Sequence, residues 1–224
     1  MTNFDWKQLF NPEFYILLQI GGVKIGLIVV LFIVFAETGL LAGFFLPGDS
    51  LLFLAGIYSS TLMQQFSLGN DFLNVTVLAS LIAGAGILGN MFGYWFGAKS
   101  GQYLFNRPDN FFFKKKYLYD AQNFFENYGN KAVIFARFIP IVRTFVPVIA
   151  GIVKMDKKKF MFFNILGSFL WSFSMIFAGH YLYELFLEKF QIDLKHYIEY
   201  IVIGLVLVTT LPVIFKFLKK KVHL

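Results

Sequence analysis

The sequence predicts an all-α integral membrane protein, and three observations carry that prediction. Of the 224 residues, 58% are hydrophobic and only 15% are charged, whereas soluble domains typically contain about 25% charged residues. Four apolar runs are long enough to cross the hydrocarbon core of a bilayer, which takes about 20 residues as a helix. Most basic residues lie in the short segments between apolar runs, as the positive-inside rule expects.

Each of the four runs predicts one transmembrane helix. The runs cover residues 14–36, 75–98, 160–187 and 197–218. The N-terminal stretch MTNFDWKQLFNPEF lacks a basic segment followed at once by an apolar core. We therefore expect the first run to remain a membrane anchor and not to be removed as a signal peptide.

Two further apolar stretches, 37–60 and 132–153, contain prolines and charged residues. Proline breaks the hydrogen-bond ladder of a helix, and irregular backbone at membrane depth is tolerated only where protein or a water-filled cavity satisfies it. Both stretches therefore predict re-entrant helical hairpins, which enter and leave on the same side. The expected bends are at Pro47 and Gly48 in the first hairpin and at Pro140 and Pro147 in the second.

The two hairpins resemble each other in sequence. FLPGDSLLFLAG (45–56) and FIPIVRTFVPVIAG (138–151) both begin with Phe, an aliphatic residue and Pro, and both end in Ala-Gly. The distribution of basic residues places both termini in the cytoplasm and opens the two hairpins toward opposite sides. An inverted repeat of this kind is typical of secondary transporters.

The polar segment 110–131 predicts a cytoplasmic amphipathic helix lying at the membrane interface, with a linker helix packed on the bundle as the alternative. The net charge of +7 does not indicate nucleic-acid binding, because the basic residues are spread over the segments between apolar runs. We expect the bilayer to be the partner of this charge.

Glycines recur every four residues in the second apolar run and predict a smooth stripe for close helix packing. They are Gly89, Gly93, Gly97 and Gly101. The overlapping GAGILG (84–89) fits dinucleotide-binding spacing but lacks the preceding strand that such a site needs. Asn90 follows Gly89 and has two open roles, as an interhelical hydrogen-bond donor or as a residue that lines a cavity.

No cofactor, metal or enzymatic site is predicted. The chain has no cysteine, and His180, His196 and His223 are not at metal-ligand spacing. A membrane phosphatase would need a nucleophile or a metal near its phosphate site, and both hairpins lack histidine. For His180, near the outer end of the third run, we expect a packed or interfacial role.

Four charged residues at membrane depth need an explanation, namely Glu37, Asp49, Arg137 and Arg143. Each ionised residue at the bilayer centre costs about 2.5–3.5 kcal/mol, so such residues must pair or face a cavity. Both acids belong to the first stretch and both bases to the second, which predicts a neutral quartet between the repeats. Purely architectural salt bridges are the alternative, but buried ion pairs stabilise poorly.

The residue types suggest roles for this quartet. Arginine stays charged and presents a planar fork that matches phosphate oxygens, so Arg137 and Arg143 are candidates for binding an anionic head group. Glu37 and Asp49 can exchange protons, and a carboxylate that becomes protonated releases its arginine. Ser50, Thr144 and Asn90 are candidates for lining the cavity.

At these positions the chain resembles the DedA family of bacterial inner-membrane proteins, which is related to eukaryotic VTT-domain lipid scramblases. The resemblance rests on the spacing of Glu37 and Asp49, on PGDSLLFLAG (47–56), on GNMFGYWFGAKSG (89–101) and on RFIPIVRTFVPVIAG (137–151). Acids and arginines essential in the family match all four charges of the quartet. Many relatives carry Asp where this chain has Asn90.

The resemblance implies a transporter in the bacterial inner membrane that returns undecaprenyl phosphate, the carrier lipid of envelope synthesis, across the bilayer. We expect coupling to the proton motive force, with protons or sodium as the coupling ion. The alternatives are a phospholipid flippase or scramblase and a proton- or cation-coupled transporter of small solutes. A homo-oligomer remains open.

Overall fold

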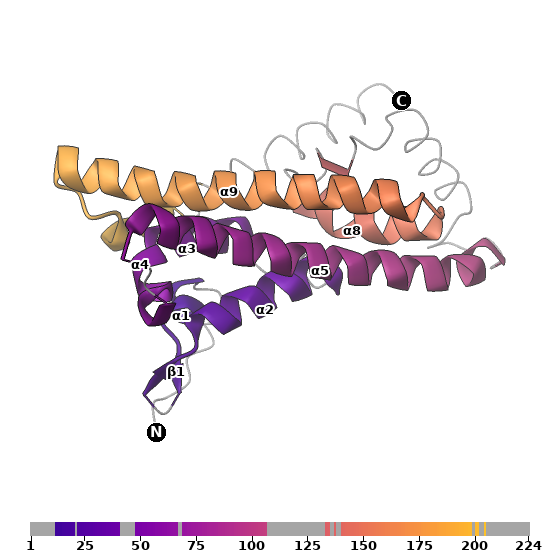
Figure 1. Cartoon of the computed structure of the whole chain (residues 1–224), viewed down its shortest axis with the longest axis horizontal. Helices are drawn as coiled ribbons and strands as arrows, with labels where there is room; N and C mark the ends of the chain where they lie inside the picture. The colour runs from indigo at the N-terminus through magenta and orange to yellow at the C-terminus, as the bar shows by residue number, and fades with distance from the viewer. Residues whose placement is uncertain are drawn as a thin grey trace. The chain divides into compact units, whose positions relative to one another are not determined.

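The computed structural model describes residues 12–20, 22–40, 48–66, 69–106, 133–134, 137, 140–198, 200–201 and 204. The chain folds into two compact units. Unit 1 comprises Met1–Ile33, Phe45–Ile82 and Ser172–Leu224, and unit 2 comprises Val34–Phe44 and Ala83–Trp171. The elements follow one another in the order α1 (Pro12–Ile16), β1 (Gln19–Ile20), β2 (Val23–Lys24), α2 (Gly26–Gly39), α3 (Gly48–Ile57), α4 (Ser59–Leu62), η3 (Gln64–Phe66), α5 (Asp71–Asn106), α8 (Pro140–Ile152), α9 (Lys157–Phe190) and η4 (Leu194–Tyr197) (Figure 1).

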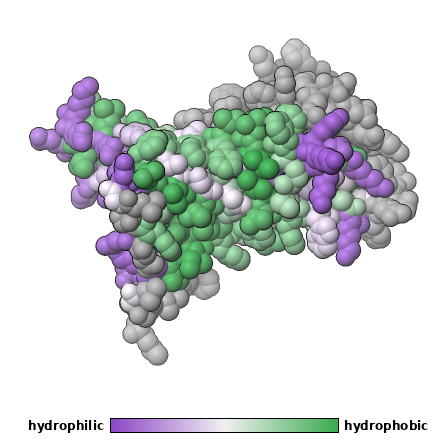
Figure 2. Space-filling view, viewed as in Figure 1, coloured by the Kyte–Doolittle hydropathy of each residue, from purple (hydrophilic) through white to green (hydrophobic). Residues whose placement is uncertain are grey.

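Two helices, α5 and α9, are long and apolar enough to cross a membrane. Their apolar parts, Asp71–Gly101 and Lys157–Phe190, contain 31 and 34 residues. At about 1.5 Å per residue they extend over roughly 46 and 51 Å, more than the ~30 Å of a hydrocarbon core. The helices predicted at 75–98 and 160–187 are thus confirmed, and both are longer than expected. In Figure 2, apolar side chains cover the middle of α9 and hydrophilic ones gather at its two ends.

The first apolar run differs from the continuous helix expected over 14–36. It contains the short helix α1, a two-residue antiparallel ladder and only then the 14-residue helix α2. Gly22 lies in the turn of the ladder at φ +82°, a left-handed conformation that glycine adopts readily, and this turn interrupts the helical run. The ladder, in which Gln19 pairs with Lys24, is also a small departure from the all-α prediction.

In the part that the structure describes, each predicted hairpin stretch contains one helix of intermediate length. Helix α3 begins at Gly48 and buries nine of its ten residues, as a helix without a polar face should. Helix α8 begins at Pro140, a favoured residue at the first helical position because its missing N–H needs no partner there. The re-entrant topology stays a prediction, since residues 41–47 and 138–139 lie outside the described part of the chain.

Two other predicted elements fall largely outside the described residues. The amphipathic helix expected over 110–131 lies wholly outside them. Of the last span, expected over 197–218, the structure describes only 197–198, 200–201 and 204.

In unit 2, the glycine stripe of α5 lets α2 and α8 pack closely against this helix. The packing role predicted from the glycine spacing is thus confirmed. A Cβ atom on Gly97 would overlap the carbonyl oxygen of Val148 in α8, and one on Gly101 would lie 2.9 Å from the Cα of Ile152. A Cβ on Gly89 would overlap Thr38 at the end of α2. The backbones of α2 and α8 therefore approach α5 more closely than any residue with a side chain would permit.

Unit 1 contains a comparable close approach between α3 and α9. A Cβ on Gly56 would overlap the carbonyl oxygen of Ile176 and would lie 3.1 Å from the Cα of Gly179. The reverse also holds, because a Cβ on Gly179 would overlap the carbonyl oxygen of Phe53. The short helix α4 follows α3 and begins at Ser59, three residues after Gly56.

Candidate functional site

The candidate site in unit 2 begins with Glu37, near the C-terminal end of α2. The sequence prediction placed Glu37 at the start of a hairpin, but α2 continues through it to Gly39. Its side chain is fully buried. The hydroxyl of the neighbouring Thr38 donates a hydrogen bond to the carbonyl of Val34 at 2.9 Å. This second buried polar group therefore has its partner within α2.

Arg143, on the first half of α8, forms an ion pair with Glu37. Its Nη2 donates to Oε1 of the carboxylate, and the two side chains are 4% and 1% exposed. The guanidinium also lies over the ring of Trp171, 4.7 Å from its centroid. An arginine that is held by both a carboxylate and an aromatic face has a fixed orientation.

Arg137 lies between the helical residues 133–134 and the start of α8. It is 3% exposed, and its Nη2 donates to Oδ1 of Asn164 at 2.5 Å. Gly167 makes room for it, since a Cβ there would lie 3.0 Å from Cδ of Arg137. The Nε atom is buried and has no hydrogen-bond partner in the described part of the chain.

Asn164, on α9, organises the polar groups around Arg137. Its Oδ1 also accepts a hydrogen bond from Nδ2 of Asn90 at 2.8 Å, and its Nδ2 donates to the carbonyl of Ile87 at 3.3 Å. Asn90 is therefore an interhelical hydrogen-bond donor, one of the two roles that its sequence position allowed. Asn164 and Trp171 were missed by sequence reasoning, although an asparagine within an apolar run is a detectable signal.

Among the described residues of unit 2, the buried charges do not cancel locally. Arg143 and Glu37 form a pair, whereas no carboxylate among the residues described contacts Arg137. The charge of Arg143 also acts repulsively on Arg137. A buried cation without a counter-ion is expensive and attracts anions strongly, because the surrounding dielectric is low.

Asp49 and Ser50 belong to unit 1, in the first turn of α3. Asp49 is half-buried and Ser50 is buried, and a carboxylate at a helix N-terminus interacts favourably with the helix dipole. Glu37, Arg137, Arg143, Thr144 and Asn90 belong to unit 2. The structure thus assigns three members of the predicted quartet to one unit and Asp49 to the other.

The four residues predicted to form the hairpin bends do not share one structural setting. Pro47 lies outside the described residues, Gly48 is the first residue of α3, and Pro140 is the first residue of α8. Pro147 lies inside α8 and not at a turn. Because proline has no N–H, it cannot donate the usual helical hydrogen bond to the carbonyl four residues earlier, which is that of Arg143.

Unit 1 also contains an apolar groove of about 600 Å³, formed by α1, the β-ladder, α2, α4, η3 and α5. Of the described residues that line it, only Lys24 is charged, and its Nζ donates to Oε1 of Gln64. Leucine, isoleucine, methionine and phenylalanine side chains provide most of the remaining surface. A groove of this composition is suited to hydrocarbon chains.

Comparison with known proteins defines the class to which this fold and site belong. A family profile for the VTT domain matches residues 46–181. No solved structure gives a significant match. Long apolar helices, buried charges and this match together define a VTT-domain membrane protein.

Individual relatives narrow the class to a family. The chain is 34% identical to the protein DedA of Escherichia coli K12 over 193 residues, which are 86% of this chain and 82% of DedA. It is 33% identical to the inner membrane protein YqjA of the same strain, over 80% of this chain and 73% of YqjA. An uncharacterized membrane protein of Mycobacterium tuberculosis H37Rv is 42% identical over 68% of this chain and 64% of its own length. The chain belongs to the DedA family.

Proposed function

We propose that this protein moves a phosphate-bearing lipid across the bacterial inner membrane and that Arg137 binds the phosphate. One observation carries the proposal. Arg137 is buried, its Nε has no acceptor, and no carboxylate contacts it, all within the described part of the chain. Its planar fork matches phosphate oxygens, and Asn164 fixes one side of that fork.

The family resemblance favours undecaprenyl phosphate as the lipid. The hydrocarbon part of a polyprenyl phosphate is soluble in the bilayer, whereas its phosphate must be desolvated to cross. A buried cation meets that requirement.

The Glu37–Arg143 pair supplies a means of coupling transport to protons. Protonation of Glu37 removes the charge that holds Arg143 and makes a second guanidinium available to the phosphate. Loss of the proton restores the pair and displaces the anion. Asp49 is the second candidate for proton exchange, and sodium is the alternative coupling ion.

The two hairpin stretches would expose the phosphate site alternately to each side of the membrane, as in other inverted-repeat transporters. In this scheme both termini are cytoplasmic, and Ser50 and Thr144 line the path of the head group. The protein acts as a transporter, and no covalent step is required.

Reconstitution in liposomes tests the proposal. The exposure of undecaprenyl phosphate on the inner leaflet would be followed with and without a pH gradient. We expect Arg137→Gln to abolish transport and Arg137→Lys to leave only a small fraction, since lysine keeps the charge but not the fork. Lys159→Gln, at an exposed position at the start of α9, is the control and should behave as wild type.

The assay also separates the alternative functions. Equal rates for wild type and Arg137→Gln would contradict the proposal. Transport without dependence on an ion gradient would indicate a passive scramblase. A small-solute transporter would move its solute at a rate that added lipid phosphate does not change.

A further inference from the structure

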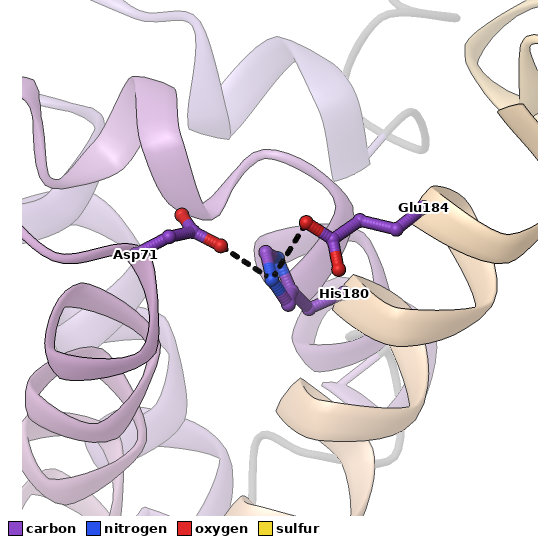
Figure 3. A group of neighbouring side chains, drawn as sticks. All are labelled: Asp71, His180 and Glu184. Atoms are coloured by element: carbon purple, nitrogen blue, oxygen red, sulfur yellow. Dashed lines mark ion pairs between the residues drawn. The ribbon is translucent and has the colours of Figure 1, made fainter. Parts of the chain in front are cut away.

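Three titratable side chains in unit 1 converge where α5 begins and α9 approaches its C-terminal end. Nε2 of His180 lies 2.7 Å from Oδ2 of Asp71 and 3.5 Å from Oε1 of Glu184. Figure 3 shows both carboxylates directed at this nitrogen. One donor atom from each residue lies within 4.8 Å of the other two. Asp71 and Glu184 are separated by more than 100 residues, so only folding creates the cluster.

His180 is held in a fixed orientation by the packing around it. It is 5% exposed, and its Nδ1 lies 3.0 Å from the hydroxyl oxygen of Ser59, the first residue of α4. The close contact between Gly56 and Gly179 brings α3 and α9 together three residues before Ser59 and one residue before His180. Ser59 therefore occupies one ring nitrogen and leaves the other to face the two carboxylates.

We propose that Asp71, His180 and Glu184 form a binding site for a divalent transition-metal ion, with Zn²⁺ as the best-matched ion. If Nδ1–H donates to Ser59, the lone pair of Nε2 is directed at the point where the carboxylates meet. One imidazole nitrogen and two carboxylate oxygens are a donor set for zinc or manganese, whereas magnesium prefers oxygen and water.

Charge supports the same assignment. With His180 neutral, the cluster carries two negative charges and no positive one, and a divalent cation balances them. A single hydrogen on Nε2 can be shared with only one carboxylate at good geometry. A metal ion would satisfy all three groups at once.

The geometry requires only small adjustments. Zn–N and Zn–O bonds are about 2.0–2.2 Å, so neighbouring ligand atoms of a tetrahedral site are roughly 3.4 Å apart. The distance from Nε2 to Glu184 already fits, the distance from Nε2 to Asp71 must widen from 2.7 Å to about 3.4 Å, and the two carboxylate oxygens lie within 4.8 Å of each other. Both carboxylates can adjust, since the side chains of Asp71 and Glu184 are 48% and 43% exposed.

The site would connect parts of unit 1 that are distant in sequence. Asp71 is the first residue of α5, and the other two ligands lie one turn apart on α9. In the topology expected from the basic residues, both of these helix ends face the outer side of the membrane. The ion would therefore bind from outside the cell and fix α5 to α9.

Zinc binding to the full-length protein in detergent tests the proposal. After treatment with a chelator, we expect one Zn²⁺ per chain by equilibrium dialysis and a higher thermal unfolding midpoint. His180→Gln should abolish this binding, and Asp71→Asn and Glu184→Gln should each weaken it by more than about tenfold. Ser59→Ala should weaken it by about tenfold, as expected for a group that orients a ligand.

Two variants and one ion serve as controls. Glu188→Gln removes an exposed acid one turn beyond Glu184, and His196→Gln removes the exposed histidine beside Asp193. Both should bind Zn²⁺ as wild type does, and Mg²⁺ should not compete. If His180→Gln does not fold, the surface variants Asp71→Asn and Glu184→Gln decide the question.

Three results would overturn the assignment. The first is the absence of stoichiometric Zn²⁺ binding to the wild type. The second is wild-type affinity for Zn²⁺ in both Asp71→Asn and Glu184→Gln. The third is loss of Zn²⁺ binding in His196→Gln while the variants of the proposed site still bind the ion.

Discussion

Arg143 on α8 donates to Glu37 on α2 across 106 residues of sequence, and both side chains are almost completely withdrawn from solvent. Desolvation cancels much of the attraction in such a pair, so apolar residues at both positions would often be equally stable. The pair is therefore better explained by a function that separates its two charges than by stability.

Removing one member of this pair should be more harmful than removing both. Glu37→Gln alone leaves a buried uncompensated guanidinium and should cost about 3–5 kcal/mol. The double variant Glu37→Gln/Arg143→Met leaves no buried charge at either position and should recover most of that loss. Thermal unfolding in detergent of the two single variants and the double variant measures the coupling, and strictly additive effects would contradict it.

The same substitution tests coupling. A glutamine side chain cannot exchange a proton. Over the pH range in which Glu37 gains and loses its proton, transport by the Glu37→Gln variant should therefore no longer change with pH. The pH profile of transport in liposomes is the measurement. A profile unchanged from wild type would exclude Glu37 from the coupling step.

Asn164→Asp should block the phosphate site without unfolding the protein. The new carboxylate would lie within hydrogen-bond distance of Arg137 and would neutralise the charge that a phosphate needs. Asn164→Ala is the control, since it removes the hydrogen bonds but adds no charge. We expect competition binding of lipid phosphate to be lost in Asn164→Asp and only reduced in Asn164→Ala. Wild-type binding by Asn164→Asp would show that the phosphate does not use Arg137.

Two glycines of α5 provide a matched test of helix packing in unit 2. Gly97→Ala should destabilise the protein, because its Cβ would overlap the Val148 backbone, which cannot move aside. Gly84→Ala places a Cβ where nothing lies within 4 Å and should be neutral or stabilising by about 0.5–1 kcal/mol through helix propensity. Unfolding midpoints of the two variants check the contrast, and equal midpoints would contradict it.

Pro147→Ala should stabilise α8 and slow transport. Alanine restores the N–H that can donate to the carbonyl of Arg143, and a proline within a helix costs about 3 kcal/mol. A Cβ atom on Gly93 would lie 3.3 Å from the Cβ of Pro147, and alanine retains that Cβ at position 147. A raised unfolding midpoint with a lower transport rate is the expected result, and an unchanged rate would show that the hydrogen bond missing at Pro147 has no part in the cycle.

Residue type and spacing predicted much of this protein. The two long helices were identified from length and apolar content alone. The glycine stripe of α5 was identified from its four-residue spacing, and Glu37 and Arg143 were singled out because charge at membrane depth needs a partner. Each of these signals lies in residues that are close together in the sequence, or requires only that the chain is in a membrane.

Features that depend on tertiary contacts could not be predicted in this way. The role of Asn164 depends on which side of α9 faces Arg137 and Asn90. The convergence of Asp71 with His180 and Glu184 depends on which face of α5 and which face of α9 lie toward each other. The interruption of the first run comes from a turn at Gly22, which a count of apolar residues does not register.

The contact between Gly56 and Gly179 has a consequence for any transport cycle. With the backbones of α3 and α9 touching at this point, neither water nor a lipid chain can enter between them, and neither helix can rotate without a steric clash. We therefore expect α3 and the adjoining part of α9 to move as one rigid segment, with any hinge in another part of the chain.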